Sequence, residues 1–229
     1  MERFKFLAFE CRMIVTIDGP AGAGKSSAAR ELARRLGFHF LDTGAMYRAV
    51  TLAAVRAGVN LEDADALLRV AERCEISVED DRVLLDGEDV TRTIRSMEIT
   101  AATRHAADHP GIRQRLVELQ RRAADGQDVV TEGRDQSTVV FPHAECKVFL
   151  TASEQVRAER RYLDLVGRGE RVSLAEVVEN QRVRDDGDTR RKVGALIKAS
   201  DAVEVSTDGL TQEQVVERLL QIVEERRND

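Results

Sequence analysis

The stretch GPAGAGKS, residues 19–26, lies between an apolar run, MIVTI at residues 13–17, and a helical pattern, SAARELARRL at residues 27–36. A glycine-rich loop between a strand and a helix can wrap its backbone N–H groups around a phosphate, and the positive end of the helix adds to the attraction. At this spacing Lys25 reaches the β- and γ-phosphates, and the Ser26 hydroxyl can ligate Mg²⁺. The sequence therefore predicts a P-loop that binds a nucleoside triphosphate.

Short β-branched or aromatic runs alternate with helical patterns along most of the chain. The predicted strands are residues 13–18, 38–42, 128–132, 146–151 and 202–206, and the clearest helices are residues 25–36, 45–57 and 212–227. Such alternation is typical of a parallel sheet with helices on both faces. We therefore predict an α/β fold with a doubly wound, five-stranded parallel sheet.

Two regions interrupt this alternation, and we expect both at the end of the sheet where open α/β folds bind ligands. Residues 60–124 contain an antiparallel hairpin at residues 75–90 and two later helices, at residues 97–108 and 112–123. Residues 153–192 have a helical pattern rich in arginine and are the candidate lid. The predicted domain spans residues 13–229, with its core at residues 13–59, 125–152 and 193–229. Residues 1–12 read as an N-terminal extension, either an artefact of the assigned start or an added edge strand.

Composition narrows the class of protein. The 229 residues include 42% hydrophobic residues and have a formal net charge of −6, with a sequence pI near 5.4. This balance argues against a dedicated nucleic-acid binder and against a protein that binds anionic membranes. Cys11, Cys74 and Cys146 lack metal-ligand spacing, which favours a reducing cytoplasm. We expect a cytoplasmic enzyme and a monomer.

Four further motifs resemble those of bacterial cytidylate kinases, which are P-loop nucleoside monophosphate kinases. They are LDTGAMYR at residues 41–48, GRD at 133–135, TVVFP at 138–142 and RDDGDTRR at 184–191. The similarity runs from Met13 to the C-terminus, and LDGEDVT at residues 85–91, with Arg95 shortly after it, resembles the monophosphate-binding insert peculiar to that family. The resemblance implies transfer of the ATP γ-phosphoryl group to CMP and dCMP, with Mg²⁺ required.

The resemblance also implies roles for individual residues. The ATP-binding residues would be Gly19, Pro20, Ala21, Gly22, Ala23, Gly24, Lys25, Ser26, Ser27, Arg157 and Arg161. The CMP-binding residues would be Thr43, Tyr47, Arg48, Thr103, Arg113, Arg134, Asp135, Arg184, Asp188 and Arg191. Lys25, Arg134, Arg184 and Arg191 would be catalytic, and Ser26 would bind the metal. Glu132 is open to two interpretations, one in which it orients a water on Mg²⁺ and one in which it pairs with an arginine such as Arg134.

Base choice would rest on Asp135 and Arg113, which match the positions that face cytosine in the family. A carboxylate accepts from the exocyclic amino group of cytosine, whereas the carbonyl of uracil at that position would repel it. The alternative role for Asp135 is that of a structural carboxylate at a helix or lid contact.

Three positions depart from the family pattern. Ser137 stands where a glycine is usual, so we expect either strain of about 1 kcal/mol there, if that position requires a positive φ, or a loop that differs slightly from the family's. Arg104 replaces a base-facing serine, with Thr103 as a possible substitute, and VGAL at residues 193–196 replaces a proline–leucine pair, which would loosen the hinge.

Three other classes of protein fit the sequence less well. A kinase for shikimate or for another monophosphate lacks the GRD-TVVFP loop and the antiparallel insert. A regulatory GTPase would carry an N-K-x-D motif, which this sequence lacks. A motor or DNA-repair ATPase would show an apolar strand ending in two acidic residues and a basic surface, and the sequence shows neither.

Overall fold

The central sheet has five strands, all parallel. The computed structural model describes residues 13–79 and 82–228, so the predicted extension at residues 1–12 lies outside the described residues. The strands are β1 (Ile14–Asp18), β2 (His39–Asp42), β6 (Val129–Gly133), β7 (Cys146–Thr151) and β8 (Val203–Ser206), in the spatial order β2-β6-β1-β7-β8. The predicted five-stranded parallel sheet is therefore confirmed, with strand ends that move by at most one residue.

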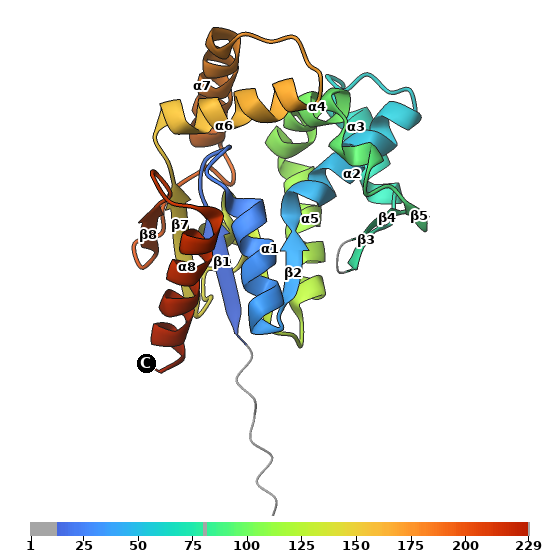
Figure 1. The fold of residues 1–229 in the computed structure, drawn as a ribbon. Helices are drawn as coiled ribbons and strands as arrows, with labels where there is room; N and C mark the ends of the chain where they lie inside the picture. The colour runs from blue at the N-terminus through green and yellow to red at the C-terminus, as the bar shows by residue number, and fades with distance from the viewer. Residues whose placement is uncertain (1–12, 80–81, 229) are drawn as a thin grey trace, which may run out of the picture.

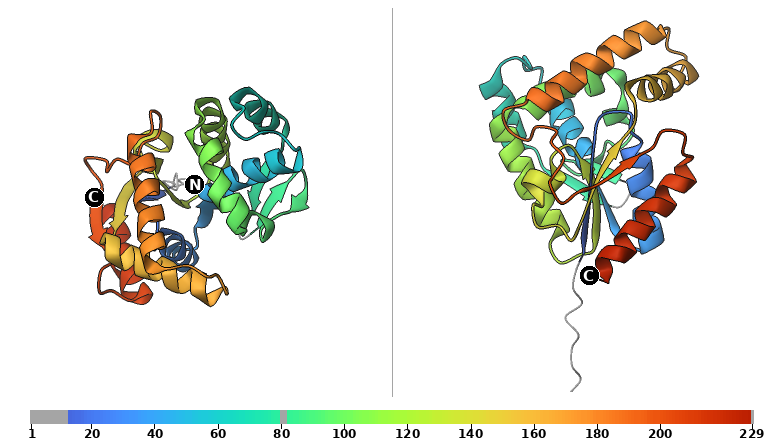
Figure 2. Two further views of the ribbon diagram at one scale, coloured as in Figure 1. Left: turned by 90° about the horizontal axis from the view of Figure 1, so that it is seen from above. Right: turned by 90° about the vertical axis from the view of Figure 1, so that its left-hand side faces the viewer.

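Helices cover both faces of the sheet, as the right-hand view of Figure 2 shows. One face packs against α1 (Lys25–Leu36) and α8 (Gln212–Arg227), and the other against α2 (Thr43–Arg56) and α5 (Pro110–Ala124). Fully buried residues such as Leu32 and Leu219 fill the first layer, and Val50 and Leu116 fill the second. Because the central strands are buried on both sides, they read as continuous apolar runs in the sequence.

Capping residues explain where the helices differ from the predicted ranges. The helix predicted at residues 45–57 begins two residues earlier, because the Asp42 carboxylate accepts from the backbone N–H of Ala45 at 2.8 Å and caps α2. The helix predicted at residues 112–123 begins at Pro110, which fits the first turn because its missing N–H needs no partner there. The helices at residues 25–36, 97–108 and 212–227 match their predictions.

The first interrupting region forms a separate lobe beside α2 (Figure 1). It holds α3 (Ala64–Arg73), the strands β3 (Ile76–Glu79), β4 (Arg82–Leu85) and β5 (Glu88–Asp89), a short 3₁₀ turn (Thr93–Arg95) and α4 (Met97–Asp108). The predicted hairpin is in fact a three-stranded antiparallel sheet, in the order β3-β4-β5. Its last strand pairs because Asp86 and Gly87, with φ of 52° and 82°, close a tight turn after β4.

Two helices, α6 (Glu154–Gly167) and α7 (Leu174–Arg190), cross above the carboxyl ends of the strands (Figure 1). They enclose a small apolar cluster of their own around Ala158, Leu165 and Val177. The described part of the chain contains no helix that is both long enough and apolar enough to cross a membrane.

Candidate functional site

The P-loop between β1 and α1 has the backbone conformation that its glycines permit. Gly22 and Gly24 have φ of 80° and 91°, which other residues rarely adopt. Gly19 lies so close to β7 that a Cβ atom there would overlap the Leu150 carbonyl oxygen. Gly24 caps α1 without a side-chain acceptor, so the first N–H groups of this helix point into the loop and can bind an anion.

Lys25 is buried at the start of α1 and donates to the Pro20 carbonyl at 2.8 Å. Burial lowers the pKa of Lys25 to about 7, and the charges of Arg134 and Arg184 act in the same direction, against Glu132. This cationic surrounding is unfavourable for the protein alone, and a phosphate placed there would relieve it.

Ser26 and Glu132 form a possible magnesium site. The Ser26 hydroxyl donates to Glu132 Oε1 at 2.8 Å, and Glu132 is buried at the carboxyl end of β6. Among the described residues there is no cluster of three or more His, Cys, Asp or Glu suited to a metal ion. A hydroxyl and a carboxylate nevertheless fit Mg²⁺, which keeps several waters and takes phosphate oxygens as ligands. Of the two interpretations of Glu132, the pairing with Arg134 is not seen, since Arg134 pairs with Asp188, and the metal role stays a prediction.

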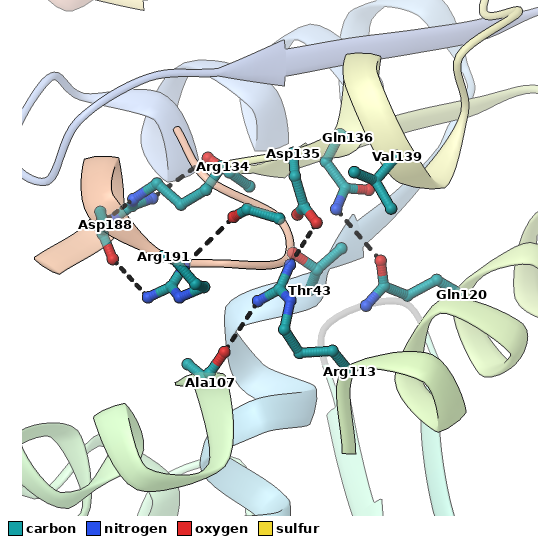
Figure 3. Close-up of polar contacts among 12 residues, drawn as sticks. Thr43, Ala107, Arg113, Gln120, Arg134, Asp135, Gln136, Val139, Asp188 and Arg191 are labelled. Atoms are coloured by element: carbon teal, nitrogen blue, oxygen red, sulfur yellow. Dashed lines mark hydrogen bonds and ion pairs between the residues drawn. The ribbon is translucent and has the colours of Figure 1, made fainter. Parts of the chain in front are cut away.

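Asp188 of α7 joins two of the predicted acceptor arginines. It accepts from Arg134 Nε at 2.7 Å and from Arg191 Nη2 at 2.7 Å, as Figure 3 shows. Burial opposes ionisation of Asp188, but the two guanidinium groups keep the pKa of this carboxyl below its usual value. Arg184 is exposed but lies near the same group, where local desolvation and the charge of Arg134 lower its pKa to about 10, so it stays protonated at neutral pH.

A second buried ion pair joins Arg113 of α5 to Asp135 of the GRD turn (Figure 3). Their side chains are only 4% and 5% exposed. Arg113 also donates to the Ala107 carbonyl at 3.0 Å, and its guanidinium lies 5.5 Å from the centre of the Tyr47 ring. The Thr43 hydroxyl donates to the backbone carbonyl of Glu132 at 2.7 Å. The structure therefore brings Thr43, Tyr47, Arg113 and Asp135 together.

Other predicted residues contact protein groups in the structure, and their predicted roles stay predictions. The Thr103 hydroxyl donates to the Ile99 carbonyl of its own helix at 2.6 Å, and Arg104 is exposed. Arg157 is buried and donates to the Ala21 carbonyl of the P-loop at 3.0 Å. It thus contacts the backbone of the P-loop, whereas the half-buried Arg161 pairs with Asp164 of α6.

Ser137 does not have a positive φ, so the condition under which strain was expected is not met. Among the described residues, Asp86 is the only non-glycine residue with a positive φ. Ser137 lies in a short π-helical turn, Gln136–Val140, and its hydroxyl donates to Asp18 Oδ2 at 2.5 Å. The side chain thus adds a contact that a glycine could not make.

Sequence reasoning missed Asp18, which supports the site. Asp18, at the end of β1, accepts from the backbone N–H groups of Gln136 and Ser137 at 2.9 and 2.7 Å. It therefore ties the strand that leads into the P-loop to the turn that carries Arg134 and Asp135. Burial raises the pKa of Asp18, against these hydrogen bonds. One signal for this role was present in the sequence, which is that Asp18 directly precedes Gly19, the first residue of the P-loop.

Arg95, which the sequence associated with the insert motif, donates to Asp42 Oδ2 at 3.2 Å. The guanidinium of Arg48 contacts the same carboxylate, so Asp42 holds both arginines. Arg95 follows the insert motif in the sequence, but nothing in its local sequence connects it to Asp42.

Comparisons with known proteins agree with this geometry. The family model for cytidylate kinase matches residues 15–225. The chain is 50% identical over 213 residues to a cytidylate kinase of Rhodopirellula baltica, covering 93% of each chain. It is 46% identical over 209 residues to one of Caldanaerobacter subterraneus subsp. tengcongensis, covering 91% of this chain and 93% of that relative.

A solved structure of an uncharacterized protein from Eubacterium ventriosum aligns with a TM-score of 0.51 and 12% identity, covering 93% of this chain and 99% of that chain. This likeness concerns the fold alone. The identities above, over nearly the whole chain, show that this protein is an ATP-dependent nucleoside monophosphate kinase of the cytidylate kinase family.

Proposed function

We propose that this protein transfers the γ-phosphoryl group of ATP to the 5′-phosphate of CMP, and also of dCMP, giving ADP and CDP or dCDP. The observation that carries the proposal is the buried Arg113–Asp135 pair, which lies at the same edge of the sheet as the P-loop lysine and the arginine cluster. A site that can bind two polyanions thus lies next to a pair of side chains that can form hydrogen bonds with a pyrimidine base. The cytoplasmic location and the monomeric state stay predictions from the sequence.

The donor side would bind ATP through the P-loop backbone, Lys25 and Ser26. Beside the loop is a hollow of about 200 Å³, lined in part by Arg160, whose guanidinium donates to the hydroxyl and the carbonyl of Thr207 at 2.8 and 2.9 Å. We assign this hollow to the nucleoside of ATP. Ser26 and Glu132 would hold Mg²⁺, which when bound neutralises charge on the β- and γ-phosphates.

The acceptor phosphate would be held by Arg48, Arg134 and Arg191, and Arg184 with Asp188 would contact the sugar as α6 and α7 close. In the structure Asp188 holds Arg134 and Arg191 with charge-assisted hydrogen bonds. These arginines are therefore already oriented toward one another before an anion arrives.

The base would be read by Asp135 and Arg113. Asp135 accepts from the exocyclic amino group of cytosine, and the guanidinium donates to ring acceptors. One such pairing discriminates by about 1–3 kcal/mol, so a preference for CMP over UMP on the order of ten- to a hundredfold is expected.

The reaction is an in-line displacement in which an acceptor phosphate oxygen forms a bond to the γ-phosphorus as the bond to the β,γ-bridging oxygen breaks. ADP carries away the electron pair of the broken bond. Lys25, Arg134 and Arg184 surround the position where charge accumulates on the transferred group, and they stabilise it without reorganising. Closure of α6 and α7 would exclude water, which would otherwise accept the phosphoryl group.

The test is ATP consumption with Mg²⁺ and, in parallel, CMP, dCMP, UMP, AMP, GMP, dTMP, shikimate or no acceptor. We expect fast turnover with CMP and dCMP and slow turnover with UMP. A clear preference for another acceptor would contradict the cytidylate assignment, and turnover without any acceptor would indicate an ATPase.

A further inference from the structure

Gly194, in the segment that follows α7, lies directly on the Arg113–Asp135 pair. Its φ is 70°, and a Cβ atom built on it would overlap Arg113 Nη2 and Asp135 Oδ2. Gly37 has the same φ of 70°, but nothing lies within 4 Å of the position that its Cβ atom would take. The backbone conformation therefore explains glycine at residue 37, whereas close approach to an ion pair is a second requirement at residue 194.

The ion pair has little room to move away from residue 194. Both side chains are buried, and Arg113 also donates to the Ala107 carbonyl at 3.0 Å. A larger residue at position 194 would be accommodated only if Arg113 left Asp135 and Ala107, or if the segment itself lifted.

The segment that contains Gly194 is hydrogen-bonded to the end of α7 and to Arg191. The backbone N–H of Leu196 donates to the Asp188 carbonyl at 2.9 Å, and Arg191 Nη1 donates to the Gly194 carbonyl at 3.5 Å. Figure 3 shows Arg191 beside the Arg113–Asp135 pair. Lifting the segment would therefore also disturb Arg191, which pairs with the Asp188 carboxylate.

We propose that Gly194 determines acceptor specificity as a positioning residue: its bare backbone forms the wall that keeps Arg113 and Asp135 in the geometry needed to read the acceptor base. The inference rests on the base-reading role proposed above. Gly194 has no side chain that could contact substrate, and it acts through Arg113 and Asp135.

The experiment compares Gly194→Ala with Gly37→Ala. Both variants place alanine at a φ of 70°, so both carry the same backbone strain, and Gly37 caps α1 at the end opposite the P-loop. We expect Gly194→Ala to raise KM for CMP about tenfold and to reduce the kcat/KM preference for CMP over UMP by a similar factor, which corresponds to the loss of one good pairing. KM for ATP should not change, and Gly37→Ala should leave all these values unchanged.

A double-mutant cycle with Arg113→Ala separates positioning from general destabilisation. If Gly194 acts through the Arg113–Asp135 pair, adding Gly194→Ala to Arg113→Ala should reduce the preference much less than Gly194→Ala does in the wild-type protein, because the pair is already broken. Additive losses, or an unchanged preference in Gly194→Ala, would overturn the proposal.

The same assay distinguishes a failure of the role of Gly194 from a failure of the proposed function. Wild-type protein that prefers CMP, together with Gly194→Ala that keeps this preference, overturns only the role of Gly194. Wild-type protein with no preference for CMP contradicts the base-reading role itself, and the role of Gly194 falls with it.

Discussion

The donor and acceptor halves of the site are built in different ways. The phosphate-binding part of the donor half is one contiguous loop, residues 19–27, in which backbone N–H groups and one lysine would face the phosphates. The acceptor half takes side chains from α2, α5, the turn after β6, α7 and the segment behind it, and carboxylates orient its arginines.

This difference predicts different responses to mutation. Backbone donors in the P-loop are oriented by φ and ψ of a few neighbouring residues. Lys25 is the one charged side chain in the loop, so a mutation there removes the charge of the loop. Long arginine side chains have many rotamers and need fixed partners to hold one orientation. In the acceptor half, a mutation of one residue should therefore also disturb the residues that it pairs with.

The largest expected effect is that of Lys25→Ala. Removing the buried cation that faces the transferred phosphoryl group should reduce kcat on the order of 10³-fold while the fold is kept. Steady-state rates at saturating ATP and CMP, with circular dichroism as a check of folding, would measure this.

Lys147→Ala is the matched control, because Lys147 is also buried and donates to a proline carbonyl, that of Pro142, at 2.6 Å. It lies on β7 away from the cleft and pairs with Asp201. This control should lose stability and keep kcat. If the two variants lost kcat equally, the role of Lys25 would be wrong.

A smaller effect is expected for Asp135→Asn. The amide retains one acceptor but loses the charge that pairs with Arg113, so kcat/KM for CMP should fall about ten- to a hundredfold, and the preference over UMP should shrink with it. Asp201→Asn, which removes an exposed partner of Lys147, is the control and should leave the preference unchanged. An equal loss with CMP and UMP would instead indicate a structural role for Asp135.

The smallest effect concerns Ser137, which links the two halves through Asp18. Ser137→Ala removes one hydrogen bond to a buried carboxylate and should cost about 1–2 kcal/mol, or roughly 3–8 °C in Tm. Ser137→Gly should cost a further ~0.5–1 kcal/mol, because it also adds freedom to the unfolded chain. If Ser137→Gly were more stable than Ser137→Ala, residue 137 would need a left-handed conformation after all.

Much of the fold could be predicted because its signals are local. The P-loop motif, the apolar strands and the caps each depend on neighbours within a few residues, so α1, α4 and α8 begin and end where the sequence indicated. The third strand of the small sheet was missed because β5 has only two residues, Glu88 and Asp89. Such a short polar segment pairs only because the turn at residues 86–87 folds it onto β4.

The amino-acid sequence by itself determined the class of fold and the triphosphate loop, because motif spacing and periodicity are local properties of the chain, and its resemblance to a known family named most of the candidate arginines and aspartates but not Asp18. Only the tertiary structure decided which aspartate holds which arginine, that Asp18 joins the donor strand to the acceptor turn, and that Gly194 lies on the Arg113–Asp135 pair. These contacts join residues that are far apart in the chain, and their geometry follows from the packing of the sheet and its helices.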